Sequence, residues 1–63
     1  MIDVMIEQWK NLDGTTEYQW SVWREGSRME MGGPFANGDA AELAAFEYCD
    51  LKFGAERATV TRL

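Results

Sequence analysis

The sequence predicts one small α+β domain over residues 1–63, in which a mainly antiparallel four-stranded sheet carries a single helix on one face. Two observations predict this class. The first third of the chain alternates apolar and polar residues with a period of two, which is typical of strands buried on one side. A later Ala- and Glu-rich segment lies between Asn37 and Gly54, residue types that begin and end helices. The predicted element order is β-β-β-α-β.

The first two strands are predicted on either side of a tight turn. Residues 2–7 alternate and include β-branched side chains, which favour strands. Asp13-Gly14 is typical of a turn in which the glycine has a positive φ. Residues 16–25 form the second strand, with Tyr18, Trp20 and Val22 on the face that we expect to meet the helix. The two strands should form an antiparallel hairpin.

The third strand is expected to be short, near residues 28–31, after a turn at residues 25–27. We expect it to stop at residues 32–34, Gly-Gly-Pro, because proline cannot donate a hydrogen bond to a sheet and glycine weakens strand pairing.

The helix is expected to begin at Asn37 or at Asp39, which forms a capping-box pattern with Glu42, and to end near Phe53. Residues 55–63 then contain the fourth strand. A right-handed crossover through the helix makes this strand parallel to the third and the first, which gives the sheet order 4-1-2-3.

The composition argues against catalysis. The chain has no histidine, which removes the usual general base, and its single cysteine rules out a disulfide within the chain and the common zinc sites. Cys49 lies next to Asp50, whose charge would raise the pKa of the thiol, so we interpret Cys49 as a packing residue. The sequence therefore predicts no enzyme activity, no catalytic residue, no cofactor and no metal site.

The charge of the chain indicates the chemistry of a partner. Eleven acidic and six basic residues give a net charge of −5, which repels phosphate groups and attracts basic protein surfaces. The alternative is that the acidity only keeps a small protein soluble. No apolar run approaches the roughly 20 residues of a membrane helix, and no signal peptide is apparent in residues 1–4. We therefore expect a cytoplasmic protein with no membrane partner.

Glu47 has two interpretations. On a helical wheel it falls among apolar residues, so it is either a partly buried carboxylate paired with an arginine, or an edge residue of a rotated helix. Arg24, Arg57 and Arg62 are the candidate partners in the first case. In the second case the buried stripe consists of Leu43, Phe46 and Phe53.

The face of the sheet away from the helix is the candidate site. One helix covers one face, so the other is exposed to solvent or bound to a partner. The predicted partner-binding residues are Asp3, Met5, Glu7, Trp9, Glu17, Trp23 and Glu30. Charged residues around tryptophan are common at protein interfaces. The alternative is that the tryptophans only stabilise the sheet through cross-strand contacts.

Several short motifs resemble those of bacterial and phage β-β-β-α modules. They are Trp20-Ser21-Val22, Gly26, Gly33-Pro34-Phe35-Ala36 and Asp39-Ala40-Ala41-Glu42. In outline the pattern is similar to the arm-binding domains of tyrosine recombinases, and it covers about half of the chain. This chain differs in charge, because acidic residues occupy the sheet where DNA-binding members would carry basic ones.

In size, acidity and aromatic content the chain also resembles small phage-encoded inhibitors, including anti-CRISPR and anti-restriction proteins. This resemblance implies a protein that blocks a basic nucleic-acid-binding surface, for example on a CRISPR-Cas effector, by presenting carboxylates in place of phosphates. The alternatives are a divergent sheet-plus-helix nucleic-acid-binding domain and a structural domain that forms homodimers through the same face.

Overall fold

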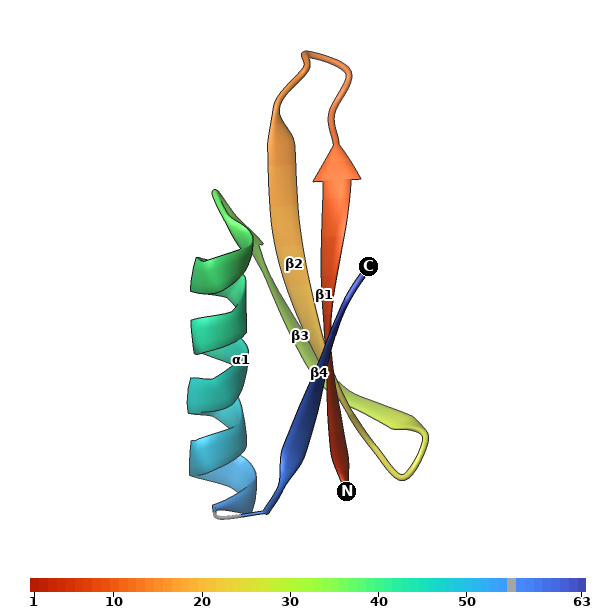
Figure 1. Ribbon diagram of the computed structural model, residues 1–63, viewed down its shortest axis with the longest axis vertical. Helices are drawn as coiled ribbons and strands as arrows, with labels where there is room; N and C mark the ends of the chain where they lie inside the picture. Colours follow the sequence, from red (N-terminus) through yellow and green to blue (C-terminus); the bar gives the residue numbers. More distant parts are fainter. Residues whose placement is uncertain (55) are drawn as a thin grey trace.

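The computed structural model describes residues 1–54 and 56–63. Position 55, the first residue of the segment expected to contain the fourth strand, lies outside the described residues. The described residues form four strands and one helix (Figure 1). They are β1 (Ile2–Lys10), β2 (Thr16–Arg24), β3 (Ser27–Phe35), α1 (Gly38–Phe53) and β4 (Ala58–Arg62). The predicted α+β class and the β-β-β-α-β order are confirmed.

The four strands form one mixed sheet in the order β3-β2-β1-β4, counted from the β3 edge. The sequence-based order 4-1-2-3 names the strands from the β4 edge. β1 pairs with β2, and β2 with β3, in antiparallel fashion. β4 pairs with β1 in parallel, and α1 forms the connection from β3 to β4. The sheet is therefore antiparallel except at its β1–β4 edge.

The hairpin of β1 and β2 extends to the predicted turn, so β1 continues beyond its first six alternating residues as far as Lys10. Its ladder runs without a break from Ile2 opposite Arg24 to Lys10 opposite Thr16. The Asp13 carboxylate accepts hydrogen bonds from the backbone N–H and the hydroxyl of Thr15, at 2.9 and 2.7 Å. These bonds close the turn and lower the pKa of Asp13.

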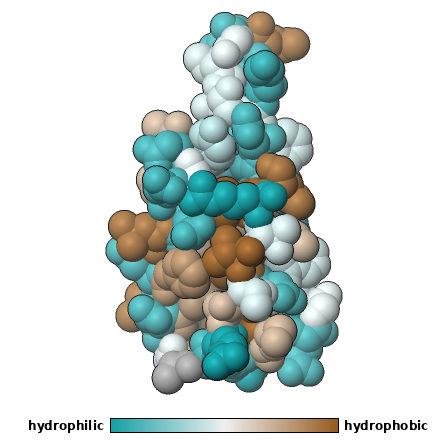
Figure 2. Space-filling model, viewed as in Figure 1, coloured by the Kyte–Doolittle hydropathy of each residue, from teal (hydrophilic) through white to brown (hydrophobic). Residues whose placement is uncertain are grey.

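The end of this hairpin projects as an arm beyond the rest of the molecule (Figures 1 and 2). Leu12, in the turn at its tip, is fully exposed. β4 pairs only with residues 2–6 of β1, so the remainder of β1 has β2 as its one paired neighbour. The arm is thus a two-stranded ribbon.

The prediction of a short third strand was wrong. β3 extends through Gly32, Gly33 and Pro34 to Phe35. Because β3 is an edge strand, Pro34 needs no donor on its outer side, and the glycines are accommodated where the ladder contains a bulge.

α1 begins and ends close to the predicted positions. Asn37 is the N-cap, and its side-chain oxygen accepts a hydrogen bond from the N–H of Ala40 at 2.8 Å. Gly54 ends the helix with a φ of 63°, a conformation that favours glycine. Of the two predicted N-caps, the structure uses Asn37, and Asp39 lies in the first turn.

Both interpretations of Glu47 were wrong about which face of the helix is buried. The buried residues of α1 are small: Gly38, Ala41, Ala45 and Cys49. Glu47 is exposed, and Leu43, which the second interpretation buried, is 62% exposed. The sheet supplies bulky side chains, so only a helix stripe of small residues can pack closely against it.

The core lies between α1 and the sheet. Ile2, Val4 and Ile6 of β1 and Trp20 and Val22 of β2 contact the buried residues of the helix. The Trp20 ring packs against Tyr48 with centroids 5.6 Å apart, and Tyr48 meets Phe53 edge-on at 6.0 Å. The predicted helix-facing residues of β1 and β2 therefore do face α1, which leaves the opposite face of the sheet uncovered by the helix.

Candidate functional site

The register of the strands defines the side of the sheet away from α1. In β1 the buried residues are Ile2, Val4 and Ile6, so residues 3, 5, 7 and 9 point to the other side. Directly paired residues lie on the same side, which adds residues 17, 19, 21 and 23 of β2. We call this side the open face. It contains six of the seven predicted site residues: Asp3, Met5, Glu7, Trp9, Glu17 and Trp23.

Trp23 is held in place on the open face. Its indole N–H donates a hydrogen bond of 2.9 Å to the hydroxyl of Ser21, two residues earlier on the same strand. Ser21 is buried although it lies on the side away from the helix. The half-buried Trp23 ring is thus a preorganised apolar element, and its polar atom already has a partner.

Trp9 differs from Trp23 in its exposure. It lies near the end of β1, opposite Glu17, and is 51% exposed. Met5, closer to the middle of the sheet, is half-buried opposite Ser21. The face therefore has an apolar centre at Met5 and Trp23, and a second, more exposed aromatic residue toward the projecting arm.

Three carboxylates accompany these apolar residues. Asp3 accepts a hydrogen bond of 2.7 Å from the hydroxyl of Thr59 on β4, which fixes its position. Glu7 and Glu17 are half-buried, and in the described part of the chain neither lies within 4.0 Å of a basic group. Their charges remain available to a partner.

The assignment of Glu30 to this face was wrong. Val22 pairs with Glu30 while Trp23 pairs with Arg28, so Met29 is an extra residue that forms a bulge in β3. The bulge reverses the alternation, and Glu30 lies on the side of Val22, which faces the helix. Glu30 is exposed there, and its Oε1 accepts a hydrogen bond from the N–H of Met31 at 3.1 Å.

The register also places residues on the open face that the sequence-based prediction of the site omitted. Thr59 and Thr61 of β4 pair with Asp3 and Met5. Met31, which is 47% exposed, pairs with Ser21. Arg28 pairs with Trp23 and also lies on the open face, in agreement with the alternation of the sequence. β4 was not assigned to faces from its sequence because its register with β1 depends on the crossover, and Met31 was obscured by the bulge.

The structure assigns other charged residues to ion pairs away from this face. Arg62 contacts Asp39 and Glu42 of α1 at 2.8 and 3.1 Å, which ties β4 to the start of the helix. Arg24 contacts Glu56 at 3.0 Å and lies 5.3 Å above the Phe53 ring. Two of the arginines considered as partners for Glu47 therefore pair elsewhere.

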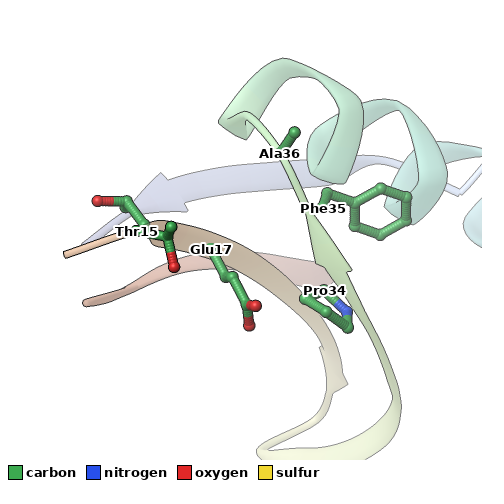
Figure 3. Close-up of a pocket in the computed structure, with 6 residues that line it drawn as sticks. Thr15, Glu17, Pro34, Phe35 and Ala36 are labelled. Carbon is green, nitrogen blue, oxygen red and sulfur yellow. The ribbon is translucent and has the colours of Figure 1, made fainter. Parts of the chain in front are cut away.

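A shallow pocket lies at one end of the sheet, next to the open face. The last pair between β2 and β3 is Tyr18 opposite Phe35, after which the chain leaves β2 for α1. This departure leaves a cavity of about 370 Å³, lined by Thr15, Thr16, Glu17, Pro34, Phe35 and Ala36 (Figure 3). This pocket could not be predicted from the sequence, because it arises where β3 leaves β2.

Three further features bear on chemistry: the thiol of Cys49, the grouping of possible metal ligands and the character of the helix. Cys49 is buried, and burial raises the pKa of its thiol, with a smaller contribution from Asp50. Residues 1–54 and 56–63 hold no cluster of three or more His, Cys, Asp or Glu side chains that is suited to a metal ion. Within the same residues, no helix has the length and hydrophobicity needed to cross a membrane.

Comparison of the chain with family models, with curated proteins and with solved structures gave no match. The function therefore has to be inferred from the open face and from the pocket beside it.

Proposed function

We propose that this chain is a non-enzymatic protein-binding module whose open face docks on a basic, nucleic-acid-binding surface of a larger protein and blocks it. The observation that carries the proposal is the placement of Asp3, Glu7 and Glu17 on the same side of the sheet as Trp9 and Trp23, with α1 on the other side. Carboxylates attract the basic surface, and the tryptophans supply apolar anchors.

The spacing of the charges supports partial imitation of a phosphate backbone. Alternate residues of a strand lie about 6.6 Å apart, close to the step between phosphates of one DNA strand. Asp3 and Glu7 are four residues apart on β1 with Met5 between them, so their positions are about 13 Å apart, which corresponds to two phosphate steps. Because every second position is apolar, specific binding in this proposal depends on contacts made by Met5 and Trp23 as well as on charge.

The size of the molecule sets the scale of the interface. The Cα atoms extend over 39 × 20 × 15 Å. A sheet face on a molecule of these dimensions is no larger than the roughly 800 Å² that each partner contributes to a standard protein interface. The whole open face would therefore be used by one partner.

In its most specific form, the proposal is a phage- or transposon-encoded inhibitor of a nucleic-acid-binding assembly such as a CRISPR-Cas effector. The support for this form is the combination of small size, net charge of −5 and an acidic, aromatic face. An inhibitor of this kind would act in the cytoplasm of the host cell.

The experiment that tests the proposed function compares two ligands. A fluorescent basic peptide of mixed arginine and lysine and a fluorescent duplex DNA are each titrated with the protein at low salt, and anisotropy is recorded. We expect the peptide to bind and the DNA not to bind. DNA binding whose affinity falls steeply with salt would contradict the proposal and favour a nucleic-acid-binding domain.

Two double variants test whether peptide binding depends on the acidic residues of the open face or only on net charge. We expect Glu7→Gln with Glu17→Gln to weaken peptide binding about tenfold, equivalent to roughly 1.4 kcal/mol. The control, Glu30→Gln with Glu47→Gln, removes the same charge from exposed positions outside the open face and should leave the affinity within about twofold. Equal losses in both variants would show that net charge alone attracts the peptide. A dimer that is lost on Trp23→Glu would assign the face to self-association.

A further inference from the structure

The pocket beside the open face has a composition that selects one kind of side chain. Its walls are Thr15 with the first two residues of β2, and the end of β3 with the residue that follows it, residues 34–36 (Figure 3). In Figure 3 the Phe35 ring points toward α1, and the Glu17 side chain and Pro34 lie across the pocket from each other. The pocket therefore combines one carboxylate with apolar surface from Pro34, Phe35 and Ala36.

The backbone of β2 adds polar groups. The N–H of Asn11 donates to the carbonyl of Thr15 at 2.8 Å, so residue 15 is hydrogen-bonded toward β1. Hydrogen bonding in an antiparallel ladder alternates along the strand, so the N–H and carbonyl of Thr16 point away from β1. They point to the side where β3 has already left the sheet, which is the side of the pocket.

From this arrangement we propose that the pocket binds the side chain of an arginine on the partner protein. The planar guanidinium packs against Pro34, while its N–H groups donate to the Glu17 carboxylate and to the carbonyl of Thr16. An ammonium group is a compact, strongly hydrated charge and makes poorer use of the apolar wall. The volume of about 370 Å³ is at the lower end of ligand pockets, which suits a single large side chain.

This inference rests on the proposed function, because it names the group by which a basic partner would anchor to the sheet. Glu17 joins the two regions: it lines the pocket, and on the open face it lies opposite Trp9. An arginine bound at Glu17 is thus next to the most exposed aromatic residue of the face.

The test uses the full chain labelled with ¹⁵N and three probes: N-acetyl-arginine amide, N-acetyl-lysine amide and, as an uncharged control, N-acetyl-norleucine amide. We expect the arginine probe to shift the amide signals of Thr16, Glu17 and Ala36 in a saturable manner with a millimolar dissociation constant. The lysine probe should bind several-fold more weakly, and the norleucine probe should cause no saturable shift. Shifts that are absent from these residues, or equal for arginine and lysine, would overturn the proposal.

Two variants make the result specific. Glu17→Gln should weaken arginine binding at least fivefold, and Glu30→Gln, which changes an acid on the other side of the sheet, should not. Ala36→Leu keeps the carboxylate but narrows the pocket, and should also abolish binding. The same spectra report whether each variant is folded. Unchanged affinity in folded Glu17→Gln or in folded Ala36→Leu would overturn the assignment.

The outcomes separate this inference from the proposed function. Binding of the basic peptide to the open face without binding of the arginine probe would remove the pocket from the proposal and leave the function standing. Binding of the arginine probe to the pocket, without binding of the basic peptide to the open face, would contradict the proposed function and leave the pocket as an arginine site.

Discussion

The indole ring of Trp20 lies directly over Gly32, its partner on β3. A Cβ atom built on Gly32 would lie 2.6 Å from ring atoms Cε2 and Cζ2 of Trp20. Glycine is therefore needed at position 32 for close approach rather than for its backbone angles. Because of this contact, Trp20, the largest aromatic residue of the core, packs between β3 and Tyr48 of α1.

From this contact we expect Gly32→Ala to destabilise the protein by about 1–3 kcal/mol, since the added methyl group displaces a buried ring from a packed core. Chemical denaturation followed by tryptophan fluorescence measures the change. Ser27→Ala, at an exposed position of the same strand, is the control and should stay within about 0.5 kcal/mol of the parent. A Gly32→Ala protein as stable as the control would show that Trp20 can move aside without cost.

The turn between β2 and β3 offers a stabilising substitution. Glu25 has a φ of 56° and Gly26 a φ of 79°, which is the pattern of a two-residue turn that favours Asn-Gly. We expect Glu25→Asn to raise the free energy of unfolding by about 0.5–1 kcal/mol, because asparagine tolerates positive φ better than glutamate. Glu25→Gln removes the same charge and keeps the strain. An equal gain in both variants would assign the effect to charge.

The ion pair of Arg24 and Glu56 predicts a dependence of stability on pH. The hydrogen bond from Arg24 lowers the pKa of Glu56 below its ordinary 4.5, and the charges of Arg24 and the N-terminus add to this. A lowered pKa in the folded state means that the stabilisation is complete above pH 4.5 and is lost as the pH falls through the folded-state value. Asp13, whose pKa is also lowered, contributes in the same direction.

We therefore expect Glu56→Gln to lose stability at neutral pH and to show a shallower loss on acidification than the parent. Thermal unfolding between pH 3 and pH 7 measures both effects. The control Glu47→Gln changes an exposed acid on α1 and should retain the parental slope. A parental slope in Glu56→Gln would show that other carboxylates control the acid response.

Features that depend on local chemistry could be predicted from the sequence. The turn at Asp13-Gly14, the helix end at Gly54 and the N-cap, narrowed to Asn37 or Asp39, each depend on neighbouring residues alone. Alternation likewise predicted that Val4 and Val22 face the helix.

Features that depend on the neighbours of a strand or helix could not be predicted. β3 includes Pro34 because it is an edge strand, which its own sequence does not reveal. The bulge at Met29 moved Glu30 to the helix side, and one extra residue is enough to reverse a face. The helix buried its small residues and exposed Leu51 to 88%, because the size of the facing Trp20 decided how the two surfaces fit.

The central claim is that the open face binds a basic partner. The three tryptophan indole N–H signals of the ¹⁵N-labelled protein test it in one titration with the basic peptide. Trp9 and Trp23 lie on the open face, and Trp20 is buried beneath α1. The account predicts that the signals of Trp9 and Trp23 shift while that of Trp20 stays. Shifts of Trp20 and of the exposed helix residues Leu43 and Leu51, with Trp9 and Trp23 unchanged, would contradict it.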